Sequence, residues 1–132
     1  MAQGRTEAAE AGRRIRDEMF GEETTTAQVT AGDPLFARLQ EIVTETCFGE
    51  TWARPALSRR DRSIATVAML AALGREHELR THIRGALSNG VSPDEIRELA
   101  IHAHLYAGLP AAFGAAAAAD DVFTAEEKAA LS

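Results

Sequence analysis

The chain has 132 residues, of which 45% are hydrophobic and 26% charged, and its formal net charge is −6. This length suits one folded domain, and the acidic balance argues against a general nucleic-acid binder, which needs a basic face. Cys47 is the single cysteine and has no second cysteine to pair with, which favours a reducing cytoplasm. The longest apolar run is too short to span a bilayer, and the first residues lack the layout of a signal peptide. We therefore expect a cytoplasmic protein that binds neither nucleic acid nor membranes.

Residues 1–32 are polar and are expected to form a partly flexible N-terminal arm ahead of a helical domain that spans residues 33–132. Residues 5–19 within the arm could form a charged helix, and Thr24–Thr26 are typical of a linker. The role of the arm is left open.

The first helix of the domain is predicted over about residues 33–47, because Asp33 is a good N-cap and Pro34 fits the first helical position. Residues 48–57 contain a glycine and a proline that interrupt the apolar periodicity. We expect a loop there.

Ser58 caps the next predicted helix, and Gly74 ends it. The stretch Ile64–Leu73 is apolar on nearly every side. A helix without a polar face is normally buried all round, so this segment is predicted to be the central helix of the fold.

Three further helices follow. One is predicted over residues 76–88, and another begins after Ser92, where an N-cap, a proline and a capping-box glutamate coincide. That helix carries apolar residues on two opposite sides, including Ile101 and Leu105. The last helix begins at about Pro110. These elements predict a compact all-α bundle of about six helices that completes its core by oligomerising.

Glu78 and His82 are the first candidate functional pair. Residues four apart on a helix lie on the same face, so the carboxylate could orient the imidazole for acid–base chemistry. The alternative is a buried histidine that Glu78 satisfies without any catalytic role, and the residues alone favour that alternative.

Five arginines form the second candidate feature. Guanidinium groups bind carboxylates through two parallel hydrogen bonds. Arg59 and Arg60 are expected to be solvated on the first turn of a helix, whereas Arg62 adjoins the apolar stretch and is more suited to face inward. Arg54 lies in the preceding predicted loop, and Arg75 follows the end of the same helix.

His102 and His104 lie about 200° apart around their helix, so they do not share a face and do not predict a joint metal site. The sequence contains no glycine-rich phosphate loop, CxxC, HExxH or GxSxG motif. Nucleotide binding, zinc proteolysis and serine hydrolysis therefore have no support.

Three stretches carry a resemblance to a known family. They follow the patterns WxRPxLSxRxRS, LGRExELxxHxxxALxNGVSxxEIxE and LYxGxPAA, and they fall within residues 36–122. In order and spacing, the chain resembles the carboxymuconolactone decarboxylase family, which belongs to the all-helical alkylhydroperoxidase-D-like group. The resemblance implies that fold and a trimeric or hexameric assembly.

The resemblance implies cofactor-free decarboxylation of 4-carboxymuconolactone to the β-ketoadipate enol-lactone, in protocatechuate catabolism. Alkylhydroperoxidase-D-like proteins carry a C-x-x-C-x-x-x-H motif, and here Arg75 and Glu78 occupy the two cysteine positions while His82 matches. Because the redox dithiol is absent, a peroxide reductase is the least favoured activity.

Site roles follow from this expected reaction. His82, tuned by Glu78, would stabilise a dienolate or deliver a proton, and Arg62 and Arg54 would clamp substrate carboxylates. The set of expected substrate contacts is completed by Trp52, Tyr106 and Arg75. Two alternatives remain: a lyase or isomerase that acts on another small lactone, and a non-catalytic oligomeric binding protein.

Overall fold

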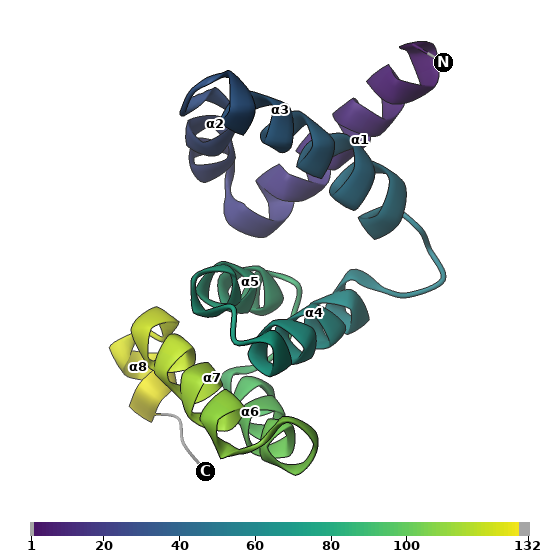
Figure 1. Cartoon of the computed structure of the whole chain (residues 1–132). Coiled ribbons are helices and arrows are strands. Elements are labelled where there is room, and N and C mark those ends of the chain that lie inside the picture. The colour runs from purple at the N-terminus through teal and green to yellow at the C-terminus, as the bar shows by residue number, and fades with distance from the viewer. Residues whose placement is uncertain (1, 130–132) are drawn as a thin grey trace. The chain divides into compact units, whose positions relative to one another are not determined.

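The computed structural model describes residues 2–129, and every regular element in this range is a helix (Figure 1). The all-α prediction is therefore confirmed for these residues. They form eight α-helices and one π-helix rather than about six helices. The chain divides into two compact units, the first ending at Leu57 and the second beginning at Ser58.

The first unit contains four helical elements in direct succession. They are α1 (Ala2–Phe20), α2 (Glu22–Thr30), α3 (Pro34–Ile42) and the π-helix η1 (Val43–Trp52). Helix α1 packs against α2 and η1, and α3 contacts α2 and η1. Helices α1 and α2, which fall within the predicted arm, are thus part of a packed unit.

The linker predicted at Thr24–Thr26 is wrong, because these residues lie inside α2. Two acidic residues occupy the first turn of α2, where their negative charges interact favourably with the positive end of the helix dipole. Thr25 is fully buried in the unit. Tertiary packing therefore stabilises a helix that threonine-rich composition alone does not indicate.

The loop predicted over residues 48–57 is also wrong for its first half, because η1 continues α3 as far as Trp52. Phe48 is buried between α1 and η1 residues and stacks on Trp52, with ring centroids 5.6 Å apart. These aromatic contacts hold the segment helical despite its glycine. Within the predicted loop, only residues 53–57 are irregular.

Two glycines allow α1 and η1 to approach at backbone distance. A Cβ atom at Gly12 would overlap the carbonyl oxygen of Thr44, and one at Gly49 would overlap the carbonyl oxygen of Ala8. Each position therefore has to be glycine, because any larger residue would collide with the backbone of the opposite helix. The crossing brings together residues more than thirty positions apart in the sequence.

A buried arginine joins three elements of the first unit. Arg16 is only 3% exposed, and its guanidinium donates hydrogen bonds to Thr44 Oγ1 (2.9 Å) and to Gln28 Oε1 (2.8 Å). It also lies over the Phe48 ring, 5.9 Å from the centroid. Burial lowers the pKa of Arg16, and Arg13 lowers it further, while Asp17 and Cys47 partly offset this effect.

The second unit contains five helices. They are α4 (Arg59–Leu73), α5 (Glu76–Ser88), α6 (Pro93–Ala107), α7 (Leu109–Val122) and α8 (Ala125–Ala129). Helix α7 packs against α4, α5 and α6, and α4 contacts α5 and α6. The core is rich in small side chains, which lets these helices pack closely. Its buried members are Val67, Ala71, Leu79, Ile83, Ala86, Val91, Ile96, Ala100, Ala115, Ala118, Ala119 and Phe123.

The helix boundaries of the second unit follow the predicted capping signals. Ser58 Oγ accepts a hydrogen bond from the Asp61 amide, and Gly74 ends α4 in the left-handed conformation at φ 71°. The predicted capping box at the start of α6 is present: Ser92 and Glu95 each accept a hydrogen bond from the other's backbone amide.

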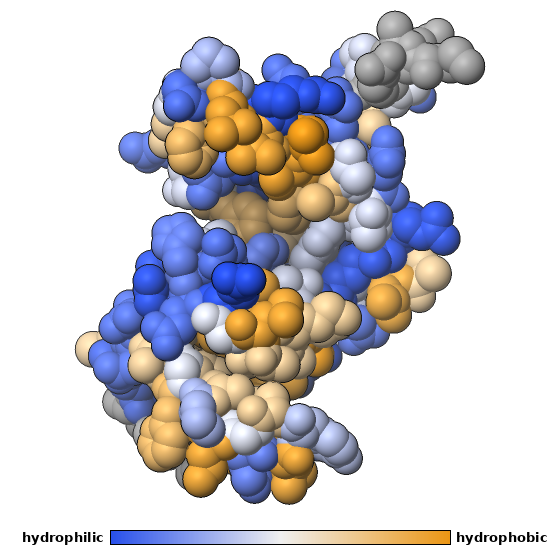
Figure 2. Space-filling model, in the orientation of Figure 1, coloured by the Kyte–Doolittle hydropathy of each residue, from blue (hydrophilic) through white to orange (hydrophobic). Residues whose placement is uncertain are grey.

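Helix α4 is not buried on all sides, contrary to the sequence prediction. Met69 is 64% exposed and Leu73 is 68% exposed. One face of α4 packs in the core through Val67 and Ala71, and the other remains uncovered within the single chain. Figure 2 shows that exposed apolar side chains also form patches elsewhere on the second unit and over α3.

Within residues 2–129, no helix combines the length and the apolar character that crossing a membrane requires.

Candidate functional site

Glu78 and His82 lie one turn apart on α5, as predicted. Glu78 is exposed, whereas His82 is half-buried beside the apolar stripe that α5 turns toward the core. Burial lowers the pKa of His82, and the negative charge of Glu78 raises it by a smaller amount. The net effect favours the neutral imidazole at pH 7, which can donate a hydrogen bond through one nitrogen and accept through the other.

Arg62 lies on the first turn of α4 and is half-buried. The start of α4 is held beside the end of α5 by a hydrogen bond from Asn89 Nδ2 to Ser63 Oγ (3.0 Å). Arg62 therefore belongs to the same pair of packed helices as His82. This pair of helices offers a cation, a neutral imidazole and a carboxylate, the groups that binding an anion and moving a proton require.

Arg60 is not a freely solvated side chain, contrary to the prediction. Its guanidinium pairs with the Glu95 carboxylate, and this interaction raises the pKa of Arg60 and lowers that of Glu95. Because Glu95 also forms the capping box of α6, the ion pair joins the starts of α4 and α6. Arg60 therefore has a structural partner and is not part of the candidate site.

Arg75 and Tyr106 are both exposed. Arg75 precedes α5 in the turn after Gly74, where its backbone amide donates to the Leu70 carbonyl oxygen (3.0 Å). Tyr106 is 85% exposed near the end of α6, and its ring lies 5.5 Å from that of His102. Within the single chain, neither side chain is enclosed.

Trp52 and Arg54 belong to the first unit. Trp52 ends η1 and is half-buried through its stacking on Phe48. Arg54 is exposed just after η1, where its amide donates to the Thr51 carbonyl oxygen (3.0 Å). The predicted roles of these two residues in substrate binding stay predictions.

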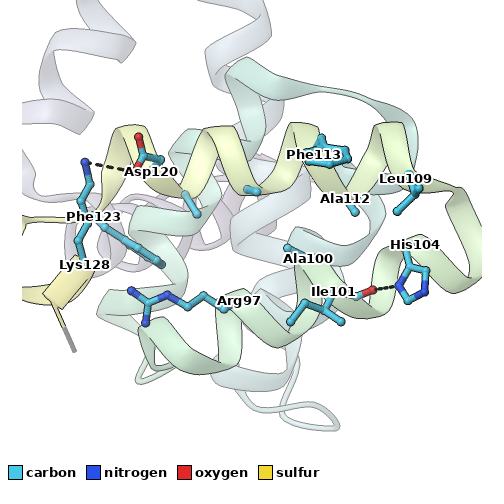
Figure 3. Close-up of a pocket in the computed structure, with 12 residues that line it drawn as sticks. Arg97, Ala100, Ile101, His104, Leu109, Ala112, Phe113, Asp120, Phe123 and Lys128 are labelled. Atoms are coloured by element: carbon cyan, nitrogen blue, oxygen red, sulfur yellow. Dashed lines mark hydrogen bonds and ion pairs between the residues drawn. The ribbon is translucent and has the colours of Figure 1, made fainter. Parts of the chain in front are cut away.

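The second unit also contains an apolar groove with a cavity volume of about 610 Å³ (Figure 3). Its walls come from α6 and α7, together with Phe123 just after α7 and Lys128 in the last turn of α8. Most of its lining is aliphatic or aromatic, including Ile101, Leu109 and Phe113. None of the site residues predicted from the sequence lines this groove.

The polar groups of the groove are largely engaged within the protein. Lys128 Nζ lies 3.3 Å from Asp120 Oδ1, and Arg97 donates to the Asp94 carboxylate (2.8 Å) and to the Glu127 carbonyl oxygen (2.6 Å). The Nδ1 atom of His104 contacts the Ile101 carbonyl oxygen, as Figure 3 shows. We interpret the groove as a surface for apolar contacts rather than as a centre for chemistry.

Sequence reasoning found only part of this groove. The second apolar side of the α6 helix was visible as Ile101 and Leu105, but its pairing with α7 was not. Leu109 and Phe113 are four residues apart and so form a matching apolar stripe on α7. That spacing is a signal in the sequence that indicates the other wall.

Comparison with known proteins places this arrangement in context. The sequence model of the carboxymuconolactone decarboxylase family matches residues 37–121. The chain belongs to this family. Residues 37–121 contain every predicted site residue, and they begin after α1 and α2.

Individual members of the family and related proteins agree with this assignment. The chain is 42% identical to a 4-carboxymuconolactone decarboxylase from Acinetobacter baylyi, over 85% of this chain and 84% of the relative. It is 36% identical to a nitrosuccinic acid decarboxylase from Metarhizium robertsii, over 75% and 69% of the two chains. An uncharacterized 15.0 kDa protein from Paracoccus denitrificans is 31% identical over 64% of each chain.

Proposed function

We propose that this protein is a carboxy-lyase that converts 4-carboxymuconolactone to the β-ketoadipate enol-lactone in the cytoplasm, during the breakdown of protocatechuate. The observation that carries the proposal is the 42% identity, over most of both chains, to a relative named for this activity. The packed helices α4 and α5 supply groups that suit the reaction.

The substrate is an unsaturated lactone that carries a carboxylate and an acetate arm on its ring. When CO2 leaves, the electron pair moves into the ring and onto the conjugated carbonyl oxygen, which gives a dienolate. The substrate is thus its own electron sink. The protein has to hold the acetate arm, stabilise the oxygen that gains charge, and allow a proton to return to carbon.

Arg62 is proposed to hold a substrate carboxylate, because its half-buried guanidinium can form two parallel charge-assisted hydrogen bonds. His82 is proposed to donate a hydrogen bond to the dienolate oxygen or to deliver the proton. A neutral imidazole in a partly desolvated position suits the first role, because the hydrogen bond is stronger there than in water. Glu78 is proposed to tune and orient His82.

Four further substrate contacts are proposed on the resemblance to the family. Arg54 would bind a second carboxylate, Trp52 and Tyr106 would shield the reacting carbon from water, and Arg75 would add positive charge. Single alanine substitutions test each residue, because loss of uniform binding raises KM without lowering kcat.

The direct test is to incubate the purified chain with 4-carboxymuconolactone, without added metal or cofactor, and to follow CO2 release together with enol-lactone formation. We expect turnover far above the rate in buffer. No turnover by a folded preparation would contradict the proposal. It would favour a different lactone as substrate or, if a lactone binds unchanged, a non-catalytic binding protein.

We also propose that the protein is a homo-oligomer, a trimer or a hexamer. Many large apolar side chains are exposed in the single chain, more than a monomer normally tolerates in contiguous patches. On the second unit they are Met69, Leu73, Ile101, Leu105, Tyr106, Leu109 and Phe113. The groove in Figure 3 lies along the same stretch of α6 and α7.

Sedimentation velocity tests the assembly. The wild-type protein should sediment as a trimer or hexamer, and Leu105→Asp should shift it toward smaller species because it places a charge among the exposed apolar residues. Glu98→Ala, an exposed polar position on the same helix, is the matched control. A monomeric wild-type protein at micromolar concentration would rule the proposal out.

A further inference from the structure

Two relatives are named as decarboxylases, and the compounds in their names share a chemical feature. Both 4-carboxymuconolactone and nitrosuccinic acid are substituted succinates. In each, one carbon carries a carboxylate, a CH2–carboxylate arm and a group that withdraws electrons. That group is the conjugated lactone in the first compound and a nitro group in the second. In both, an oxygen of this group can take up the electron pair when CO2 leaves.

The packed helices α4 and α5 carry two suitable groups at different levels along their length. The Asn89–Ser63 hydrogen bond holds the end of α5 beside the start of α4, next to Arg62. His82 precedes Asn89 by seven residues, which is about two helical turns or roughly 10 Å along α5. A long guanidinium side chain and an imidazole set apart in this way can contact two ends of one small molecule.

We infer that this pair of helices recognises a succinate through its CH2–carboxylate arm and through the oxygen that accepts charge, and not through the lactone ring, so that nitrosuccinate is a second substrate. Arg62 binds the arm, and His82 donates to the charge-accepting oxygen. This inference rests on the proposed function and deepens it by naming the substrate class.

The reaction balances without any further reagent. The bond between the nitro-bearing carbon and its carboxylate breaks, and CO2 leaves. The electron pair moves into the nitro group and forms a nitronate. A proton, from solvent or through His82, then adds to the carbon and gives 3-nitropropanoate. The net change consumes one proton and releases one CO2, as the lactone reaction does.

The two oxyanions place similar demands on the protein. Nitronate and dienolate oxygens both carry delocalised charge that a neutral imidazole N–H can stabilise, and partial burial favours the neutral form of His82. The nitro oxygens lie closer to the arm than the lactone carbonyl oxygen does. Because small displacements are costly in catalysis, we expect kcat/KM for nitrosuccinate to be roughly 10–100-fold lower than for the lactone.

The test compares three compounds with the purified full-length chain. 4-Carboxymuconolactone and nitrosuccinate are each followed by CO2 release and by NMR of the product, against the spontaneous rate in buffer. Nitroacetate, which keeps the nitro group and the departing carboxylate but lacks the arm, is the third compound. We expect turnover of the first two and no acceleration of the third.

Variants assign the contacts. Arg62→Ala should raise KM for the lactone and for nitrosuccinate, whereas Arg84→Ala, an exposed arginine on α5, should change neither. Circular dichroism establishes that each variant is folded. An equal KM for wild type and Arg62→Ala would overturn the assignment of the arm to Arg62.

The outcomes separate this inference from the proposed function. Turnover of the lactone with no acceleration of nitrosuccinate would overturn the inference and leave the proposed function in place. Nitroacetate reacting as fast as nitrosuccinate would overturn recognition through the arm. Turnover of nitrosuccinate alone would support the succinate class and overturn the proposed lactone substrate. Failure of both compounds would overturn both proposals.

Discussion

The two units of the chain are held together in different ways. The second unit has helices bounded by local capping signals and a core of small aliphatic side chains. The first unit depends on contacts between distant residues: a glycine-mediated crossing, a cluster of aromatic rings and a buried arginine. The unit that carries the candidate acid–base pair is thus also the one whose helix boundaries the sequence predicts most directly.

The largest expected effect concerns the chemistry of the second unit. His82→Ala should lower kcat by about 10²–10⁴-fold, because a hydrogen-bond donor or proton carrier is lost from the reacting centre. His77→Ala changes an exposed histidine on the same helix and should leave kcat unaltered. Steady-state kinetics measure both. Near-wild-type turnover by a folded His82→Ala protein would remove His82 from the mechanism.

The next effect concerns the stability of the first unit. Gly49→Ala should lower the free energy of unfolding by about 1–3 kcal/mol or more, because the added Cβ overlaps the Ala8 carbonyl oxygen and forces the helices apart. Gly4→Ala is the matched control on α1, since a Cβ there meets no atom within 4 Å. Urea unfolding followed by circular dichroism gives both values.

Gly4→Ala should be neutral or stabilising by up to about 1 kcal/mol, because alanine is the better helix former. If the two substitutions had equal effects, the close crossing of α1 and η1 would not stabilise the first unit, and the contrast between the units would weaken.

A smaller loss of stability is expected at the buried arginine. Arg16→Met should cost about 1–3 kcal/mol, because Thr44 and Gln28 lose a charged donor while the methionine still fills part of the space. Arg14→Met, at an exposed position on α1, should be close to neutral. Chemical unfolding again measures the difference, and a stabilised Arg16→Met protein would show that burying the charge costs more than its hydrogen bonds return.

These contrasts explain how much the sequence could predict. Ser58, Gly74 and the Ser92–Glu95 capping box act within four residues of themselves, so their helices were predicted correctly. The fit of Gly12 against Thr44 depends on an element more than thirty residues away, so neither η1 nor its packing on α1 could be inferred. The exposure of Met69 likewise depends on what lies beside α4, which periodicity does not reveal.

The same distinction holds for the candidate site. The relation of Glu78 to His82 is set by helical spacing and was predictable. The Arg60–Glu95 pair joins two helices and was not, and neither was the groove between α6 and α7. A sequence shows which groups share one helix face, whereas the partners that another helix brings appear only once the fold is known.

The smallest expected effect lies in the pH dependence of the reaction. Glu78→Gln removes the negative charge that raises the pKa of His82 and leaves the burial that lowers it. The pKa of His82 should therefore fall further below its ordinary value of 6.5. If neutral His82 is the active form, kcat is lost as pH falls through this pKa, so the acidic limb of the pH profile should move to lower pH in the variant.

If protonated His82 delivers the proton instead, kcat declines as pH rises through the same pKa, and that decline should begin at lower pH in the variant. The wild-type profile thus decides between the two roles of His82, and an unchanged profile in Glu78→Gln would show that the charge of Glu78 does not act on the reacting imidazole.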